Sequence, residues 1–404
     1  MVKLNKKYVH FFSLLLLIAI CSLTCNKRIS HLDDPFYVDP ATQNFSENPA
    51  LLERILKSPH GYFRFINIQF SNQICKRFEK AFIGAPVLNL HGDAHLEQYA
   101  VTDLGRGLTD FDDSSTGPGF IDMLRFGVSA DLVCRERGWE GKTGELFETF
   151  LNAYKSALKD PGIEAPVPEV VSQIAESFTI DRVSYFKWIN ELMEPMDAGE
   201  EDSLKEAIKS YTQIQLIEDK KLNRDYFNIV KTGRLRMGIG SALDKKYLMR
   251  VKGKTNDPGD DVVLEIKEVR DLSAIDCISS GRDLDPFRII RGQARIAYSP
   301  FKHLGYFVFG EHSFWVHSWV DNYKEVDIYE TFENFEQLQE VAYDIGVQLG
   351  KGHIKYIAYP FDLQLRTEQA KLVDRYEDDL HEVRLEFSKR VSAAWDKFRE
   401  YYEK

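Results

Sequence analysis

Cysteine is scarce in this sequence of 404 residues, which contains five. Two of the five lie in or directly after an N-terminal apolar segment, and the other three, Cys75, Cys134 and Cys277, are far apart. Three widely spaced cysteines form neither the dense disulfide framework of a small secreted domain nor a metal–thiolate site. The sequence allows one disulfide among them and does not indicate which pair forms it.

An excess of positive charge is also missing, and so are internal repeats and low-complexity stretches. Lysine and arginine total 52 residues against 63 for aspartate and glutamate, which gives a formal net charge of −11. This balance argues against nucleic acid as a partner, because nucleic-acid-binding domains carry a basic surface. Apolar residues make up 44% of the sequence, which supports a hydrophobic core in one large domain or two of medium size.

The N-terminus has the pattern of a secretory signal. Lysines among the first seven residues precede the apolar run 11–23, which is too short to span a bilayer comfortably. Because Cys25 follows this run, we expect a bacterial lipoprotein in which Cys25 is lipidated as the first mature residue. Cys21 is a weaker candidate, and an uncleaved membrane anchor is the alternative. Both interpretations predict an exported protein tethered to a membrane, in the periplasm or at the cell surface.

Hydrophobic periodicity predicts a helical region, then a small β-rich region, then a second helical region, so the expected fold class is α+β. After a signal segment (1–25) and a linker (26–48), we expect a helical lobe (49–233), a β lobe (234–325) and helices that complete the helical lobe (326–404). The expected helices are 49–57, 66–82, 121–135, 145–158, 181–193, 203–216, 286–297, 335–356 and 368–402. The expected strands lie within 87–90, 234–252, 262–270, 307–311 and 313–320.

Acidic side chains follow two apolar segments in the stretch 87–126. The first segment leads into the loop His-Gly-Asp-Ala-His, which contains Asp93, and the second leads into Asp-Phe-Asp-Asp, which begins at Asp110. Carboxylates at strand ends are poor core residues, because an ionised carboxylate buried without a partner is very costly. A hairpin-like return of the chain would bring Asp93 and Asp110 within reach of one metal-bound ligand. The alternative interpretation is loop capping and turn formation.

The β-rich region contains features that suit phosphate binding. A strand runs into a turn with Gly238, Gly240 and Ser241, whose glycines would let backbone N–H groups approach a phosphate closely. A later strand carries Lys267, whose ammonium group could neutralise phosphates. Each feature alone is weak evidence, because most such turns are simple hairpins and an edge-strand lysine commonly only solvates a sheet.

Together these features are the parts of kinase-type phosphoryl transfer: a glycine-rich hairpin, a strand lysine, a catalytic-loop aspartate and a metal-binding aspartate. Their order is reversed here, because Asp93 and Asp110 precede the glycine turn and Lys267. A circular permutation resolves this order if the helix 335–356 packs where the helix before the catalytic loop normally lies. The predicted architecture is therefore a protein-kinase-like two-lobed fold, circularly permuted.

Five motifs also resemble a known family: SPHGYFRF, HGDAHLEQY, DFDDSSTGP, GIGS and LEIKEV. Together they resemble the bacterial domain-of-unknown-function-2252 family, which is similar to the aminoglycoside-phosphotransferase branch of the kinase-like fold. The resemblance extends from residue 49 to about residue 387, and the pair of aspartate motifs is its most specific part.

The resemblance implies a role for each matching residue. Asp93 would be the catalytic base that orients or deprotonates an acceptor hydroxyl, and Asp110 would be the main Mg²⁺ ligand. Lys267 would contact the phosphates of ATP. The remaining implied roles are loop bracing by His91 and His95, a tie to the next helix through Asp122, a second metal ligand at Asp112 or Asp113, and phosphate cover by Gly238, Gly240 and Ser241.

The sequence departs from the family pattern at two positions. Gln98 stands where the family has the asparagine that is the second metal ligand, and its extra methylene changes its reach. Arg291 stands where the family has a glutamate in the helix after the lysine strand, which removes the expected acidic partner of Lys267. Glu265 and Glu268 flank Lys267 and are candidate substitutes, although Glu268 should point to the opposite face of the sheet.

Three functions remain open from the sequence. The first is an Mg²⁺- and ATP-dependent phosphotransferase that acts on the hydroxyl of an unidentified small molecule. The second is a catalytically inactive pseudokinase that binds a ligand or a partner protein, because ATP is scarce outside the cytoplasm and both departures affect the site. The third is a metal-dependent phosphoesterase built on the same His and Asp residues, but the remaining histidines form no supporting pattern.

Overall fold

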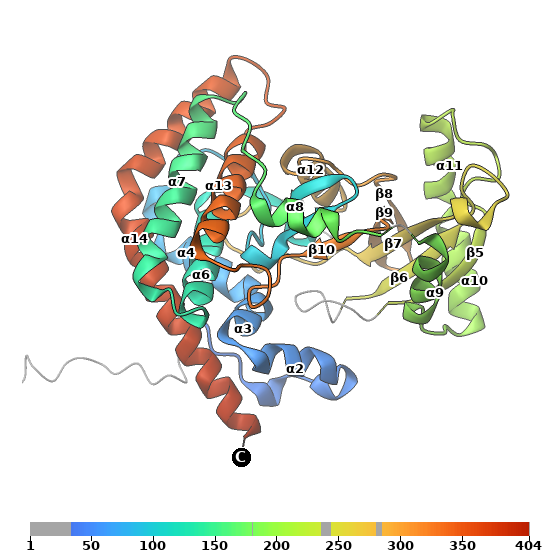
Figure 1. Ribbon diagram of the computed structural model, residues 1–404, viewed down its shortest axis with the longest axis horizontal. Helices are drawn as coiled ribbons and strands as arrows, with labels where there is room; N and C mark the ends of the chain where they lie inside the picture. Colours follow the sequence, from blue (N-terminus) through green and yellow to red (C-terminus); the bar gives the residue numbers. More distant parts are fainter. Residues whose placement is uncertain (1–33, 180, 236–243, 280–284, 404) are drawn as a thin grey trace, which may run out of the picture.

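The computed structural model describes residues 34–179, 181–235, 244–279 and 285–403 (Figure 1). Cys25 and the glycine turn with Gly238, Gly240 and Ser241 lie outside the described residues, so their proposed roles stay predictions. Within these ranges, no helix is both long enough and apolar enough to cross a membrane.

The described chain is mostly helical and contains antiparallel sheets, so the predicted α+β class is confirmed. The helices are α2 (Pro49–Lys57), α3 (Pro59–Phe65), α4 (Asn67–Arg77), α5 (Glu79–Phe82), α6 (Phe120–Glu136), α7 (Thr143–Lys159), α8 (Glu169–Glu176), α9 (Arg182–Leu192), α10 (Ala198–Ala207), α11 (Lys209–Glu218), α12 (Phe287–Ile296), α13 (Phe335–Gly352) and α14 (Phe361–Tyr402). The strands are β1 (Leu88–Leu90), β2 (Tyr99–Thr102), β3 (Gly105–Leu108), β4 (Ser115–Gly117), β5 (Ile229–Arg234), β6 (Lys246–Val251), β7 (Val262–Glu268), β8 (Gly305–Phe309), β9 (His312–Trp319) and β10 (Tyr323–Glu325).

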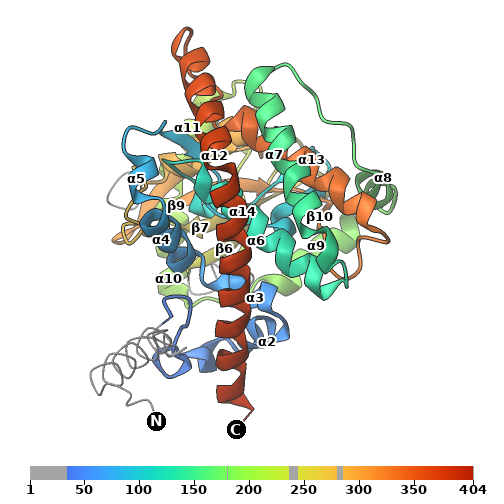
Figure 2. The same ribbon diagram turned by 90° about the vertical axis from the view of Figure 1, so that its left-hand side faces the viewer.

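The large helices α6, α7, α13 and α14 pack together on the left of Figure 1. α14 extends along the whole height of the face shown in Figure 2. Two glycines of α13 allow a close approach to α7, because a Cβ at Gly346 would lie 2.5 Å from the carbonyl oxygen of Phe150. At Gly350 the corresponding distance to the carbonyl oxygen of Tyr154 is 2.6 Å. The rigid helical core that results supports the loops described below.

Five strands form a second unit on the right of Figure 1, in the order β5-β6-β7-β9-β8. Helices α10 and α11 cover one apolar face of this sheet, where Tyr211 packs with Tyr247 and Phe314. α9 packs on part of the opposite face, against Leu248 and Val263. These three helices and strand β5 come before or end at residue 234, where we expected the β lobe to begin, and they pack with the strands that follow. The hydrophobic periodicity predicts that each helix has an apolar face, but it does not predict which element packs on that face.

Two smaller sheets bring the acidic segments together. β1 pairs with β4, with Leu90 opposite Ser115, so the chain leaves and re-enters this pair at the same end. β2 and β3 form a hairpin between them, and β10 adds to the other edge of β2. Because of this return, the loop after β1 and the segment between β3 and β4 emerge side by side. These are the segments that carry Asp93 and Asp110.

A disulfide joins Cys75 of α4 to Cys277, which lies between β7 and α12. It thereby connects the helical part of the molecule to the segment that follows the lysine strand, across 202 positions of sequence. Cys134 is a free, buried thiol. The structure thus identifies the pair that the sequence left open.

Replacing both Cys75 and Cys277 with alanine should lower the free energy of unfolding by about 3 kcal/mol, because the bond restricts a long loop of the unfolded chain. Urea unfolding of the oxidised protein measures this loss, and reduction of the wild type should reproduce it. The control variant Cys134→Ala should keep its sensitivity to reductant. Equal stability of the double variant and the wild type would show that the bond does not contribute.

Candidate functional site

The loop after β1 is held by a buried carboxylate at the start of α6. Asp122 accepts the backbone N–H groups of His91 and Gly92, each at 2.8 Å, and its side chain also lies 3.1 Å from Nε2 of His353. Asp122 has no exposed surface. These contacts tie the loop to both α6 and α13, so the position of Asp93 depends on the helical core.

Gly92 passes directly against Asp113. Its φ angle is +84°, and a Cβ at this position would lie 1.9 Å from the carbonyl oxygen of Asp113. The side chain of Asn67 bridges the two segments, because its amide donates to the carbonyl oxygen of Gly92 at 3.0 Å and to Oδ2 of Asp113 at 2.9 Å. Only glycine allows both the φ angle and the close approach here.

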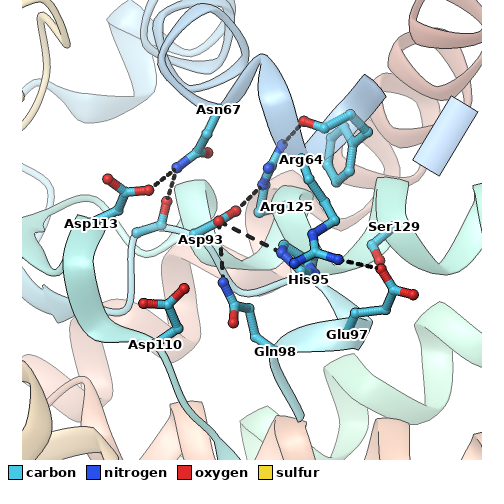
Figure 3. A network of polar contacts seen from close by, with 12 residues as sticks. Arg64, Asn67, Asp93, His95, Glu97, Gln98, Asp110, Asp113, Arg125 and Ser129 are labelled. Carbon is cyan, nitrogen blue, oxygen red and sulfur yellow. Dashed lines mark hydrogen bonds and ion pairs between the residues drawn. The ribbon is translucent and has the colours of Figure 1, made fainter. Parts of the chain in front are cut away.

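Asp93 is almost fully buried, with 5% of its surface exposed. Its Oδ1 accepts a hydrogen bond of 2.6 Å from Nε of Arg125, and its Oδ2 lies 3.4 Å from Nε2 of Gln98 (Figure 3). Arg125 is itself buried, donates to the carbonyl oxygen of Phe63 and stacks over the Phe63 ring. Burial raises the pKa of Asp93, and the charge of Arg125 opposes that shift.

The two histidines of the loop brace it from inside. Nε2 of His91 lies 2.8 Å from the carbonyl oxygen of Thr109, and its Nδ1 accepts the N–H of Asp93 at 3.2 Å. His95 is fully buried, and Nε2 of its ring lies 3.6 Å from Oδ2 of Asp93. Burial and the nearby charge of Arg64 lower the pKa of His95, so its ring is neutral. Neither ring lines the cavity described below, and both contact the loop itself.

Asp110 and Asp112 meet Lys267 of the five-stranded sheet. Nζ of Lys267 donates to Oδ1 of Asp110 at 2.6 Å and also pairs with Oδ2 of Asp112. Nε1 of Trp315 donates to the other oxygen of Asp112 at 2.9 Å. Asp110 has a φ of +54°, a left-handed conformation that is uncommon outside glycine and is found at functional sites.

The protonation of the two carboxyl groups differs because their environments differ. Burial raises the pKa of Asp112 to about 7, with the charge of Asp110 adding to the shift. For Asp110, burial acts in the same direction, but the charge of Lys267 outweighs it and lowers the pKa below its usual value. The pair therefore carries less than two full negative charges near neutral pH.

Other predicted site residues have different surroundings. Asp113 forms two hydrogen bonds with Nη1 of Arg270, at 2.9 and 3.0 Å, so its carboxylate is engaged by the protein itself. α12 carries no acidic residue, and Lys267 takes Asp110 and Asp112 as partners where a helix glutamate was expected. Glu268 contacts His312 and the backbone of Lys245, so it does not substitute for that glutamate.

Three arginines that hold this site were missed from the sequence. Arg125 binds Asp93, Arg270 binds Asp113, and Arg288 of α12 donates to the carbonyl oxygens of Asp112 and Ser114. A signal was present for Arg125, because it is a single cation within the otherwise apolar turn Met-Leu-Arg-Phe of α6. No local pattern indicated the other two.

A cavity of about 470 Å³ lies between the five-stranded sheet and the helical part of the molecule. Its lining includes Asp110, Lys246, Glu265, Lys267, Trp315 and His317. The His317 ring stacks between Phe301 and Trp315, with ring centroids 4.5 and 4.6 Å away. Lys267 and His317 overcome the effect of burial on Glu265 and lower its pKa to about 2. We call this cavity, with Asp110 and Lys267 at its wall, the cleft.

The raised pKa of Asp112 predicts a specific pH dependence of stability. The folded carboxyl group retains a proton up to about pH 7, whereas the unfolded group loses it near pH 4. The stabilisation from that proton is therefore present at low pH and is lost as the pH rises through 7. Between pH 5 and pH 8, the free energy of unfolding of the wild type should therefore fall by roughly 2 kcal/mol more than that of Asp112→Asn.

Urea unfolding at the two pH values measures this difference. Asp202→Asn, at an exposed position on α10, is the matched control and should behave as the wild type does. An Asp112→Asn variant with the pH dependence of the wild type would contradict the protonated state assigned to Asp112.

The comparison with known proteins identifies a family. A family model described as an uncharacterized protein conserved in bacteria (DUF2252) matches residues 47–184 and 172–401. The chain belongs to the DUF2252 family. The matched regions of this DUF2252 protein contain both the Asp93 loop and the Lys267 strand, so the whole described site lies within the family region. No curated protein and no solved structure matches the chain.

Proposed function

We propose that this DUF2252 protein binds a nucleoside triphosphate with Mg²⁺ in the cleft and transfers the terminal phosphoryl group to a hydroxyl of a small molecule. The observation that carries the proposal is the contact of Lys267 with Asp110 at the wall of the cleft. In a kinase-type site, the phosphate-binding lysine of the sheet and the metal-binding aspartate of the helical part lie next to each other in this way.

The residues present fit a magnesium ion. Mg²⁺ prefers oxygen ligands, and Asp110 and Asp112 place two carboxyl groups against the same ammonium group. The negative charge of these two carboxyl groups is already neutralised by Lys267 and by the proton that Asp112 retains. A divalent cation could replace that proton and the ammonium group. Bound there, Mg²⁺ would neutralise charge on the phosphates of ATP. Lys267 would then be available to the phosphates, and the glycine turn outside the described residues would cover them.

The acceptor side is assigned to the loop after β1. The side chains of Asp93, Gln98 and Asp110 lie near one another in Figure 3. In the proposed reaction Asp93 orients the acceptor hydroxyl, and Gln98 positions Asp93 or completes the ligands of the metal. His91 and His95 keep the loop in place.

The arrangement of elements supports the kinase-like, circularly permuted fold as part of this proposal. The hairpin β5–β6 is followed by the lysine strand β7, then helix α12 and the hairpin β8–β9. The Asp110 segment comes from the helical part, earlier in the chain, and reaches the cleft, and the Asp93 loop lies beside that segment. This order of elements supports a kinase-like fold whose parts follow one another along the chain in permuted order.

Export is the second part of the proposal. The signal-like N-terminus and Cys25 favour a membrane-tethered protein in the periplasm or at the cell surface. The disulfide between Cys75 and Cys277 supports this, because such bonds persist in oxidising compartments and are rare in the cytosol.

A second candidate function is nucleotide or ligand binding without turnover. Its specific support is the ion pair between Asp93 and Arg125, because the buried guanidinium group occupies Oδ1 of the carboxylate that would orient the acceptor hydroxyl. The phosphoesterase alternative has no such support. In the part of the chain that the structure describes, the one group of three or more His, Cys, Asp and Glu side chains close enough to hold a metal is Glu148, Glu377 and His381, on α7 and α14.

A transfer assay tests the proposed reaction. The full-length protein is incubated with Mg²⁺, ATP labelled at the γ-phosphate and a small-molecule extract. We expect label to move to a small molecule, and Asp93→Asn to abolish the transfer while nucleotide binding persists. Nucleotide binding without any transfer by the wild type would select the second candidate. The absence of nucleotide binding would contradict the transferase and leave only the binding of another ligand.

A further inference from the structure

A histidine and two carboxylates meet on the surface of the helical part, outside the cleft. Glu377 and His381 lie one turn apart on α14, and Glu148 comes from the neighbouring helix α7 (Figure 1). One oxygen of each carboxylate and one ring nitrogen of the histidine all lie within 4.8 Å of one another. None of these three residues lines the cleft, so they are separate from the site described above.

The packing of α14 on α7 brings these side chains together. A spacing of four residues places Glu377 and His381 on one face of their helix. The His381 ring packs edge-on against Phe147 of α7, with ring centroids 5.1 Å apart. Nε2 of His381 lies 3.6 Å from Oε2 of Glu148, which is longer than a hydrogen bond. A metal ion at about 2.1 Å from each of these two atoms would bridge a separation of this size.

The residue types suit a zinc ion. Imidazole nitrogen and carboxylate oxygen are common ligands of Zn²⁺, whereas Mg²⁺ and Ca²⁺ take oxygen ligands alone. Because zinc lies about 2.0–2.2 Å from its ligands, the three ligand atoms must approach to within about 3.5 Å of one another. The required shifts are about 1 Å. The partly exposed side chains of Glu148 and Glu377 have the freedom to make them.

A lysine already pairs with one of the three side chains. Nζ of Lys155 lies 3.0 Å from both carboxylate oxygens of Glu377 and 3.6 Å from Oδ1 of Asp374. This contact shows that Glu377 is placed to receive a cation, and it means that Lys155 competes with a metal ion for that carboxylate. Because Asp374 is a second partner, Lys155 keeps an ion pair when Glu377 turns toward a metal.

We propose that Glu148, Glu377 and His381 bind a Zn²⁺ ion that joins α14 to α7, with water completing the coordination of the ion. This inference concerns a separate site and does not depend on the proposed function. The bound ion connects α14 to the helical core through three protein ligands. Zn²⁺ should therefore raise the melting temperature, because a ligand that binds only the folded state shifts the unfolding equilibrium.

Calorimetric titration of Zn²⁺ into the full-length protein, prepared without a histidine tag, tests the site. The variants His381→Gln, Glu377→Gln and Glu148→Gln should each bind Zn²⁺ at least about tenfold more weakly than the wild type, because each lacks one ligand and even residues that only orient metal ligands contribute about tenfold to a hundredfold. His312→Gln is the matched control, because His312 is also partly exposed and pairs with a glutamate, Glu268. Its affinity for Zn²⁺ should equal that of the wild type.

A fifth variant gives the opposite sign. Lys155→Met should bind Zn²⁺ more tightly than the wild type, because Glu377 no longer pairs with an ammonium group. A purely structural role of the cluster would not produce this gain. Excess Mg²⁺ should leave Zn²⁺ binding unchanged, and circular dichroism checks that each variant is folded. Absence of Zn²⁺ binding by the wild type, or an unchanged affinity in folded His381→Gln, would contradict the proposed site.

Discussion

Replacement of Arg125 with methionine is expected to lower the free energy of unfolding by about 4 kcal/mol, because it leaves the carboxylate of Asp93 buried without its cation. Arg125 has no exposed surface, and its guanidinium group satisfies Asp93 and the carbonyl oxygen of Phe63 at once. Methionine preserves much of the apolar volume, so the loss reports the charge rather than a cavity. Urea unfolding monitored by circular dichroism measures the change.

A double-mutant cycle separates the ion pair from packing. Asp93→Asn removes the charge that Arg125 neutralises, so the variant with both changes should be more stable than the sum of the single effects implies, by at least about 1 kcal/mol. Arg77→Met is the control, because Arg77 is 40% exposed and its ion pair with Glu382 is long, at 3.9 Å. This variant should change the free energy of unfolding by less than about 0.5 kcal/mol. Additive single effects would show that the Asp93–Arg125 pair does not stabilise the fold.

Substitution of Asp110 with asparagine is expected to weaken Mg²⁺-dependent nucleotide binding roughly a hundredfold or more, because the proposed metal ligand loses its charge. Asparagine is the suitable replacement, since it tolerates the left-handed backbone that Asp110 adopts, with φ at +54°. Lys267 also keeps Asp112 as a partner in this variant. The fold should therefore persist, and the loss should be confined to the ligand.

Binding of Mg²⁺ and ATP to Asp110→Asn is measured by calorimetry, with Asp202→Asn on the exposed surface of α10 as the control. Circular dichroism checks that the variant remains folded. An unchanged Mg²⁺-dependent affinity in Asp110→Asn would exclude this residue as the metal ligand and remove the basis of the proposed site.

Some of the fold was predictable because the signals are local. The helix expected at 49–57 is α2 with the same bounds, and Asn48 caps it by accepting the N–H of Leu51. The next region was predicted less well. No helix was expected directly after residue 57, whereas Pro59 begins α3 behind the cap Ser58. The single helix expected at 66–82 is divided into α4 and α5 at Phe78. The same residue types occur at the ends of helices and at their beginnings, and tertiary packing decides which of the two forms.

The site shows the same division between local and long-range information. Strand ends placed Asp93 and Asp110 in one region of the molecule, since apolar runs followed by carboxylates are visible along the sequence. The contact of Asp110 with Lys267 joins residues 157 positions apart, and no periodicity contains it.

The most direct test of the proposed function is the melting temperature of the full-length protein with ATP, measured with Mg²⁺ and again with a chelator. A ligand that binds only the folded state raises the melting temperature in proportion to the logarithm of its concentration above the dissociation constant. We predict a rise with ATP that requires Mg²⁺ and disappears in Lys267→Met. No shift at millimolar ATP, or an equal shift without Mg²⁺, would contradict a metal–nucleotide site in the cleft.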